Sequence, residues 1–503
     1  METQRICIAQ LNPTVNDFDG NTAKIVDAIR RAKEGGARIV VTPESAILGY
    51  PSGEFSQRRE TFTRCEKAVD EIRKAAKEHG MNVVTMGGNP NTMVVINGDG
   101  EISETWDLED NGHCICPDFG EDVATVNFYL ENSPYVCGGP AKKETELVDD
   151  VRGFTTVYVN QVGANDELLF HGGSMVLSSD GDVVARGATF EEDLVFVDID
   201  GDGKPVQKEH IDHEWAPEYD GTTDALDEIA PEVLDALVLG VRDYCHKSGF
   251  EKAVVGSSGG IDSAVVLAIA VKALGAENVL AITMPSKFSS EGSVGDSVAL
   301  AENLGIELRN VSIEGIVDSF RGSIGGVKGI ADENLQARAR GTILMTISNG
   351  ENRLVLATGN KAETAAGYCT LYGDTCGAIE VISDCPKMLV YAIAREINKD
   401  GEVIPQSVID KAPSAELSPG QKDSDSLPGY PLLDRIVHER AENRRSIDEI
   451  LALGLPISES ELSRVLGLID RAEFKRRQSP SGLRVTGGAF LKGGLDIPLV
   501  AKK

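Results

Sequence analysis

The strongest chemical signal in the sequence is a stretch rich in glycine and serine, Gly256-Ser257-Ser258-Gly259-Gly260-Ile261-Asp262-Ser263. It follows an apolar run from Ala253 to Val255 and precedes a segment with the apolar spacing of a helix. Adjacent glycines let a backbone approach a ligand closely, and the N–H groups at a helix start attract anions. The Asp262 carboxylate is a ligand that Mg²⁺ accepts. These features predict a polyphosphate site, and a plain glycine-rich turn before a helix is the alternative that the stretch alone leaves open.

Residues Ser258 to Ser263 resemble the SGGxDS loop of the ATP pyrophosphatases, enzymes that cleave ATP between its α- and β-phosphates. The stretch is not a Walker A loop, because no Gly-Lys-[Ser/Thr] follows the glycines. Further blocks of sequence narrow the resemblance to the NAD synthetase family. These blocks are Met284–Ser290, Glu333–Arg338, Thr358–Asp374, Lys411–Leu417 and Glu473–Gln478.

The resemblance implies an amide ligation. The nicotinate carboxylate of deamido-NAD attacks the α-phosphate of ATP, pyrophosphate leaves, and ammonia then displaces AMP to give NAD. ATP and Mg²⁺ are the implied cofactors, with Asp262 as the magnesium ligand and the loop around it stabilising charge on the departing pyrophosphate. By the family's pattern, Thr358 also contacts ATP. The same pattern assigns four residues to deamido-NAD, namely Asn334, Glu363, Tyr368 and Lys475.

Each of these four side chains also has an ordinary structural role open to it. Asn334 suits a helix cap, Glu363 a solvated charge and Tyr368 a core position. Lys475 belongs to a basic helix end that complements a helix dipole. Other functions stay open as well: a different amide ligase of the ATP pyrophosphatase group, a carbon–nitrogen hydrolase whose C-terminal half only binds nucleotide, or a nucleotide sensor without enzyme activity.

The elements that must position these residues follow from the apolar pattern. Residues 253–255, 279–283 and 354–357 are apolar runs separated by helical segments, which predicts a parallel doubly wound sheet in the second half. The first half begins with strand, helix and strand over residues 6–41 and continues with short strands between turns, which predicts a layered α+β domain. We place a first domain at 1–200, an Asp-, Glu-, Gly- and Pro-rich linker at 201–228, and a second domain at 229–503.

Residues 1–197 resemble the nitrilase-type amidase domain that supplies ammonia in glutamine-dependent NAD synthetases. The matching segments are Ile8–Val15, Thr42–Glu44, Gly49–Pro51, Tyr158–Gly163 and Phe170–Ser174. Such domains use a Glu–Lys–Cys triad, in which the carboxylate takes the thiol proton, the cysteine attacks the glutamine amide and the lysine steadies the oxyanion. Glu44 matches the catalytic base of this amidase, a role that becomes vestigial if the triad is incomplete.

The other two triad members have no matching residue. In the segment most similar to the family's lysine block, His113 occupies the lysine position. No lysine lies between Lys77 and Lys142. The nucleophile block has no counterpart before Asn132–Tyr135, so the amidase domain looks shortened. Cys116 is followed by a proline and has no charged partner nearby, which favours an inert thiol over a nucleophile. We therefore expect ammonia as the nitrogen source and leave the use of glutamine open.

The composition excludes several classes of partner. The 49 basic and 80 acidic residues give a net charge of -31, which repels a nucleic-acid backbone. No apolar run approaches the roughly 18 residues that a membrane-spanning helix needs, and the start lacks the layout of a secretory signal. The nine cysteines are an odd number and suit reduced thiols. We expect a cytoplasmic enzyme without nucleic-acid or membrane partners, and the family resemblance implies a homo-oligomer, at least a dimer.

Overall fold

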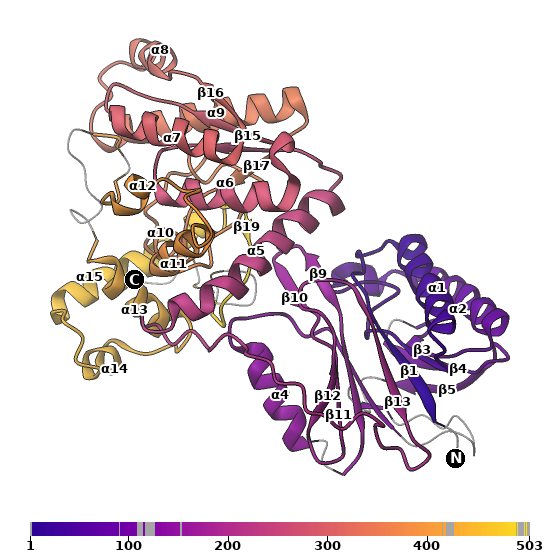
Figure 1. Ribbon diagram of the computed structural model, residues 1–503. Helices are drawn as coiled ribbons and strands as arrows, with labels where there is room; N and C mark the ends of the chain where they lie inside the picture. Colours follow the sequence, from indigo (N-terminus) through magenta and orange to yellow (C-terminus); the bar gives the residue numbers. More distant parts are fainter. Residues whose placement is uncertain are drawn as a thin grey trace. The chain divides into compact units, whose positions relative to one another are not determined.

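The structure is a computed structural model that describes residues 3–89, 91–107, 114–115, 126–150, 153–414, 416–418, 427–488, 490, 497 and 499 (Figure 1). The chain divides into two compact units, Met1–Trp215 and Ala216–Lys503. The segment that we expected to be a linker, 201–228, is shared between them. Its residues up to Trp215 pack with the first unit, and those from Ala216 onward pack with the second.

The first unit is built on two β-sheets. One has the strand order β13-β1-β2-β3-β4-β5 and the other β12-β11-β8-β7-β6, while β9 and β10 form a separate pair. The strands are β1 (Gln4–Gln10), β2 (Ile39–Val41), β3 (Asn82–Met86), β4 (Thr92–Ile96), β5 (Ile102–Asp107), β6 (Cys114–Ile115), β7 (Asn127–Glu131), β8 (Thr156–Asn160), β9 (Val162–Asn165), β10 (Leu168–His171), β11 (Met175–Leu177), β12 (Val183–Arg186) and β13 (Asp193–Ile199). The helices are η1 (Gly53–Gln57), α1 (Phe18–Glu34), α2 (Arg59–His79) and α4 (Gly139–Asp150).

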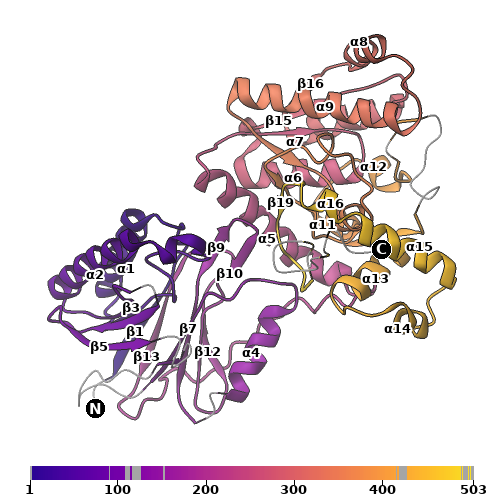
Figure 2. The ribbon, with the colours of Figure 1, turned by 180° about the vertical axis from the view of Figure 1, so that it is seen from behind.

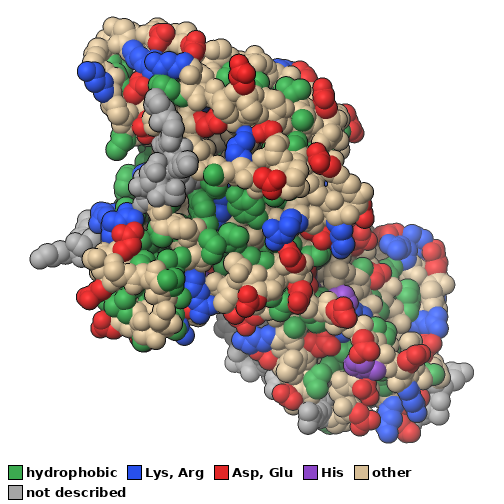
Figure 3. All heavy atoms as spheres, turned by 60° about the vertical axis from the view of Figure 1, so that its left-hand side comes forward, with side chains coloured by type: hydrophobic (Ala, Val, Ile, Leu, Met, Phe, Trp, Pro, Cys, Tyr) green, Lys and Arg blue, Asp and Glu red, His purple; other side chains and the backbone are tan. Residues whose placement is uncertain are grey.

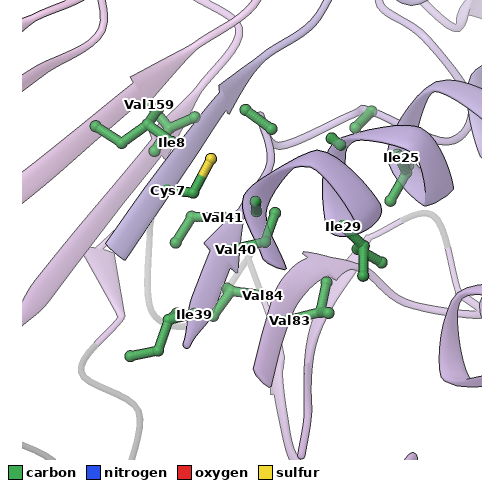
Figure 4. Packing of buried hydrophobic residues seen from close by; sticks show 14 of the residues in the cluster. Cys7, Ile8, Ile25, Ile29, Ile39, Val40, Val41, Val83, Val84 and Val159 are labelled. Carbon is green, nitrogen blue, oxygen red and sulfur yellow. The ribbon is translucent and has the colours of Figure 1, made fainter. Parts of the chain in front are cut away.

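Helices cover the outer faces of these two sheets (Figures 1 and 2). A single buried cluster joins Ile29 of α1, Val40 of β2 and Val159 of β8, so it runs from the helix through the first sheet into the second (Figure 4). On the far side, Leu147 of α4 packs against Met175 of β11. The expected layered α+β domain is therefore confirmed as a helix–sheet–sheet–helix stack, the arrangement that buries both faces of each sheet.

The second unit contains one parallel sheet with the strand order β16-β15-β14-β17-β18-β19. The strands are β14 (Ala253–Gly256), β15 (Val279–Thr283), β16 (Glu307–Asn310), β17 (Leu354–Ala357), β18 (Ile379–Glu380) and β19 (Ser481–Gly482). The helices are α5 (Leu226–Lys247), α6 (Ile261–Leu274), η2 (Ala276–Asn278), α7 (Glu291–Leu304), α8 (Glu314–Ile324), α9 (Ile330–Glu351), α10 (Lys361–Ala366), α11 (Lys387–Ile397), α12 (Gln406–Asp410), α13 (Tyr430–Ala441), α14 (Ile447–Ala452), α15 (Glu459–Arg471) and α16 (Glu473–Arg476).

The order of this sheet confirms the doubly wound fold that the apolar pattern predicts. The chain adds β15 and β16 on one side of β14, then returns to add β17, β18 and β19 on the other side. Helices α5, α6 and α11 pack together, while Ala339 and Leu344 of α9 pack against Val254 and Val355 of the sheet. The winding direction reverses between β14 and β17. In such sheets, ligands bind at the carboxyl ends of the strands that flank the reversal.

The surface carries charged side chains of both signs (Figure 3). Acidic and basic side chains are interspersed over the face seen in Figure 3, with acidic ones on both parts of the chain. Within the described part of the chain, no helix combines the length and the apolar character that a membrane crossing requires.

Candidate active site

A cavity of about 590 Å³ lies at the carboxyl ends of β14 and β17. Its volume is typical of a pocket for a small-molecule ligand. The whole predicted loop Gly256–Ser263 lines the cavity, together with Thr358, Glu363 and Tyr368. The structure therefore brings together residues from separate blocks of the sequence at the point where the sheet reverses its winding.

The loop itself is braced by its own polar groups. The Ser258 N–H donates to Ser263 Oγ at 3.3 Å, and that hydroxyl donates to the Gly260 carbonyl at 3.0 Å. Gly259 has φ +74°, and a Cβ placed there would lie 2.3 Å from the carbonyl oxygen of Ser293. Only glycine fits this close approach and this backbone conformation. The loop therefore presents its backbone to the cavity and leads directly into α6, whose first turn offers unpaired N–H groups.

Asp262 lies at the centre of a small charged group. Its Oδ1 accepts from Asn360 Nδ2 at 3.1 Å, and its Oδ2 accepts from Lys387 Nζ at 2.5 Å. The same ammonium lies 4.0 Å from Glu363 Oε1. Burial by itself would lower the pKa of Lys387, which is 1% exposed, but the carboxylates of Asp262 and Glu363 raise that pKa above its ordinary value. Lys387 is therefore a permanent cation held between two carboxylates.

A capping box at the start of α10 places Glu363 in this group. The Asn360 side chain accepts from the Glu363 N–H at 3.1 Å, and Glu363 Oε2 accepts from the Asn360 N–H at 3.3 Å. This reciprocal pattern fixes the first turn of the helix. One carboxylate oxygen of Glu363 therefore caps α10 while the other faces Lys387. The structure places Glu363 beside Asp262 and the glycine-rich loop.

Asn334 and Lys475 are not among the described residues that line the cavity, but both hold one of its walls. Asn334 Oδ1 accepts from the hydroxyl of Thr370, a lining residue, at 2.8 Å. Lys475 Nζ donates to the carbonyl oxygens on either side of Tyr368, at 2.7 and 2.6 Å. The two residues thus lie one contact behind the wall that carries Tyr368.

Sequence reasoning missed Asn360, Lys387 and Arg340. Arg340 lines the cavity from α9 and donates through Nε to the Met284 carbonyl at 3.0 Å. Burial lowers the pKa of Arg340 to about 10, with nearby carboxylates opposing this shift. Ala337, Arg340 and Leu344 all line the cavity, and this three- and four-residue spacing on a helix is the signal that identifies Arg340 as facing the site.

A buried acid lies next to the site. Glu380 ends β18 and is 3% exposed, and its carboxylate lies directly against Gly359. Burial, with a further contribution from the charge of Asp374, raises the pKa of Glu380 to about 8. Ionising Glu380 therefore opposes folding.

Glu380→Gln is expected to stabilise the protein by an amount that grows as the pH rises from about 4.5 to 8 and is constant above that range. An ordinary glutamate titrates near 4.5, so the folded state binds the extra proton between about pH 4.5 and 8 and loses stability as the pH rises through this window. Thermal unfolding at pH 5 and pH 9 measures the effect. At pH 9 the variant should melt higher than the wild type, by about 2–4 °C for each kcal/mol gained. Equal melting temperatures at both pH values would show that Glu380 is not the buried acid responsible.

The structure describes only one of the expected amidase residues. Glu44 lies in a turn after β2 and is partly buried. The next residue, Ser45, accepts through its hydroxyl from Asn132 Nδ2 at 2.7 Å, which ties this turn to the end of β7. His113 and Cys116 lie outside the described residues.

Comparison with known proteins finds a separate family model for each of the two units of the chain. Residues 233–479 match the family model for NAD synthase, and residues 5–110 and 152–207 match the model for carbon–nitrogen hydrolase. A glutamine-dependent NAD(+) synthetase from Synechocystis sp. is 36% identical over 558 residues, which cover 97% of this chain and 97% of the relative. The chain belongs to the glutamine-dependent NAD(+) synthetases. The predicted resemblance to this family is thereby confirmed.

Solved structures of glutamine-dependent NAD(+) synthetases show the same fold. The enzyme from Acinetobacter baumannii, in complex with ADP, matches with a TM-score of 0.74 and 30% identity over 99% of both chains. That from Cytophaga hutchinsonii matches with a TM-score of 0.80 and 18% identity, covering 100% of this chain and 98% of the other. The alignment with the Synechocystis relative, at 558 positions, is longer than the 503 residues of this chain. The relative therefore contains segments that this chain lacks.

Proposed function

We propose that this chain synthesises NAD by amidating deamido-NAD, with cleavage of ATP to AMP and pyrophosphate. The observation that carries the proposal is the cavity at the reversal of the parallel sheet, where the glycine-rich loop and Asp262 meet Thr358 and Glu363. A carboxylate is a poor acyl donor, and transfer of the adenylyl group from ATP gives it a leaving group that ammonia displaces. An ADP complex of the A. baumannii relative supports nucleotide binding in this fold.

The residues around the loop suit the phosphates of ATP. Backbone N–H groups at the start of α6 and the partly buried guanidinium of Arg340 supply positive potential against the net negative charge of the chain. Lys387, which also lines the cavity, supplies a fixed ammonium that donates to Asp262. These groups stabilise the charge that grows on the departing pyrophosphate.

Asp262 and Glu363 fit a magnesium ion. Both carboxylates line the cavity, and Mg²⁺ is usually held by one or two carboxylates together with substrate phosphates. Among the described residues, no cluster of three or more acidic, His or Cys side chains is arranged to hold a metal, so the phosphates and water would complete the shell. When bound, the ion would neutralise charge on the pyrophosphate and help it leave.

The dinucleotide half of the site is proposed beside Tyr368, a lining residue of the same cavity. Tyr368 and Glu363 line the cavity directly. Asn334 and Lys475 would act on deamido-NAD from one contact behind, through the loop that they hold in place.

We also propose that the chain forms a homo-oligomer, because Phe320 and other apolar side chains of α8 stay exposed on one helix face, a surface that a second copy could cover.

We propose free ammonia as the nitrogen source. The carbon–nitrogen hydrolase model matches in two pieces and leaves out residues 111–151, the stretch in which we expected the lysine and the nucleophile. The sequence has no lysine between Lys77 and Lys142. Without a lysine and a thiolate, Glu44 alone does not hydrolyse an amide. Hydrolysis of glutamine is the second candidate, because the named relatives are glutamine-dependent.

One assay tests both parts of this proposal. The purified chain is given ATP, Mg²⁺ and deamido-NAD with either ammonium or glutamine, and NAD, AMP and ADP are separated by chromatography. We expect NAD and AMP with ammonium and little product with glutamine. Formation of ADP in place of AMP would overturn the ligase, and equal rates with glutamine would overturn the choice of ammonia.

Glu44→Ala is expected to leave the ammonium-driven rate unchanged. If the amidase triad is incomplete, the carboxylate has no proton to take in this reaction, so its loss changes only local packing. Steady-state rates with ammonium for the wild type and the variant measure the effect, with Cys116→Ala as a matched variant at the other candidate amidase position. A large loss of rate in Glu44→Ala would show that the first unit contributes more than a nitrogen source.

A further inference from the structure

A buried group of charged residues lies behind the site and takes no part in the chemistry described above. We call it the Lys361 cluster, and its members are Lys361, Asp384, Glu442 and Thr486. Lys361 Nζ donates to Glu442 Oε1 at 2.7 Å and to Thr486 Oγ1 at 2.6 Å, and it lies 3.1 Å from Asp384 Oδ1. The side chains of Lys361 and Asp384 are 2% and 1% exposed. An ammonium removed from water this completely depends on such partners.

The cluster joins segments that lie far apart in the sequence. Lys361 begins α10, Glu442 follows α13, and Asp384 precedes α11. Asp384 also accepts the N–H groups of Val485 and Thr486, at 2.8 and 2.7 Å, in the segment after β19. Burial would raise the pKa of Glu442, but the nearby charges of Lys361 and a neighbouring histidine lower it to about 2. The buried ammonium of Lys361 therefore links the start of α10 to three other segments, those that carry Asp384, Glu442 and Thr486.

Lys361 lies close in the chain or in space to both residues that donate to Asp262, namely Asn360 and Lys387. Lys361 directly follows Asn360, and its N–H donates to the Cys385 carbonyl at 3.0 Å. Lys387 lies two residues beyond Cys385. Asn360 and Lys387 are the donors to the two carboxylate oxygens of Asp262. The side chain of Lys361 thus contacts Asp384, and its N–H binds the next residue in the same turn. This turn and the start of α10 together determine the positions of Lys387 and Asn360.

We propose that the Lys361 cluster is a positioning device for the ATP end of the site, which sets the orientation of the Asp262 carboxylate through Asn360 and Lys387. The inference deepens the proposed function and rests on the assignment of Asp262 to ATP. A cluster that only adds stability makes a different prediction: its loss would lower the melting temperature without changing how ATP is bound.

Lys361→Met tests the proposal against a matched control. Arg353→Met also removes a buried cation from the same sheet, but at its amino end, where Arg353 pairs with Glu351 and donates to the Asn278 carbonyl. We expect Lys361→Met to lower kcat by roughly 100-fold, the cost of a misplacement of about 1 Å in a reacting group. The KM for ATP should rise while the KM for deamido-NAD stays unchanged. Arg353→Met should melt lower than the wild type and keep wild-type values for all three constants.

A second measurement does not depend on turnover. Calorimetry measures the binding of a non-hydrolysable ATP analogue with Mg²⁺ to each variant, so the result stands even if the wild type fails to make NAD and the proposed function fails. Weaker binding in Lys361→Met with normal binding in Arg353→Met supports the positioning role. Equal binding in the two variants overturns it.

Milder variants decide the question if Lys361→Met does not fold. Thr486→Val removes one acceptor of the Lys361 ammonium, and Glu442→Gln removes one charge while keeping the side-chain shape. Weaker binding of the analogue in either variant supports the proposal. Wild-type binding and wild-type kcat in both would overturn it, because the turn that carries Lys387 would then be held without the cluster.

Discussion

Asp262→Asn is expected to lower the rate of AMP formation by roughly 100- to 1000-fold, the usual cost of removing one electrostatic contact from a transition state. Asparagine keeps the size of the side chain and still accepts from Asn360, but it has no charge. The variant therefore loses its ion pair with Lys387, now 2.5 Å away, and the proposed magnesium ligand. Quantifying AMP and NAD at saturating ATP, Mg²⁺, deamido-NAD and ammonium measures the loss.

Asp198→Asn is the matched control for this prediction. It removes a carboxylate that pairs with Arg5 at 2.8 Å in the first unit, whereas the candidate site is built by the second. Both side chains of that pair are partly exposed, so we expect little change in stability or rate. Wild-type turnover in Asp262→Asn would remove Asp262 from any role with metal or phosphate.

Lys387→Met is expected to change the response of the protein to Mg²⁺ as well as its rate. Without the ammonium, the carboxylates of Asp262 and Glu363 face one another with no cation between them. Breaking a buried ion pair costs about 3–5 kcal/mol, and we expect the lower end because Asp262 is partly exposed. Added Mg²⁺ should replace the missing charge. Thermal unfolding with and without Mg²⁺ should therefore show a larger stabilisation by the metal in the variant than in the wild type.

The double variant Asp262→Asn/Lys387→Met controls for this effect. It removes one charge of each sign, so we expect it to be more stable than Lys387→Met and no longer sensitive to Mg²⁺. An equal response to Mg²⁺ in the wild type, the single variant and the double variant would show that these carboxylates do not hold the ion.

Local sequence was sufficient for the elements and for the loop. The apolar runs at 253–255 and 354–357 predict buried strands because a strand covered on both faces is apolar along its whole length. The glycine-rich loop can be recognised in the sequence because a close backbone contact and a positive φ both require glycine at fixed positions, as at Gly259. Both features depend on residues that are neighbours in the chain, so they can be predicted without knowledge of the tertiary fold.

The roles of single polar residues were less accessible to sequence reasoning. Lys475 was predicted to contact the dinucleotide, and the structure places its ammonium on two carbonyl oxygens of the cavity wall. Lys387 was not singled out at all, because a lysine at a helix start is normally solvated. Its 1% exposure follows from the packing of α11 against α5, α6 and α13, which the local pattern does not encode.

The sequence by itself thus determined the family, the two-part fold and the loop that faces the cavity, since each depends on residue types and spacings within short segments. Only the tertiary structure decided which charges meet. Asn360 and Lys387 lie 98 and 125 residues beyond Asp262 in the sequence, and the reversal of the sheet between β14 and β17 brings their segments together. The partners of a buried charge are set by this long-range packing, because burial leaves the charge no water to pair with.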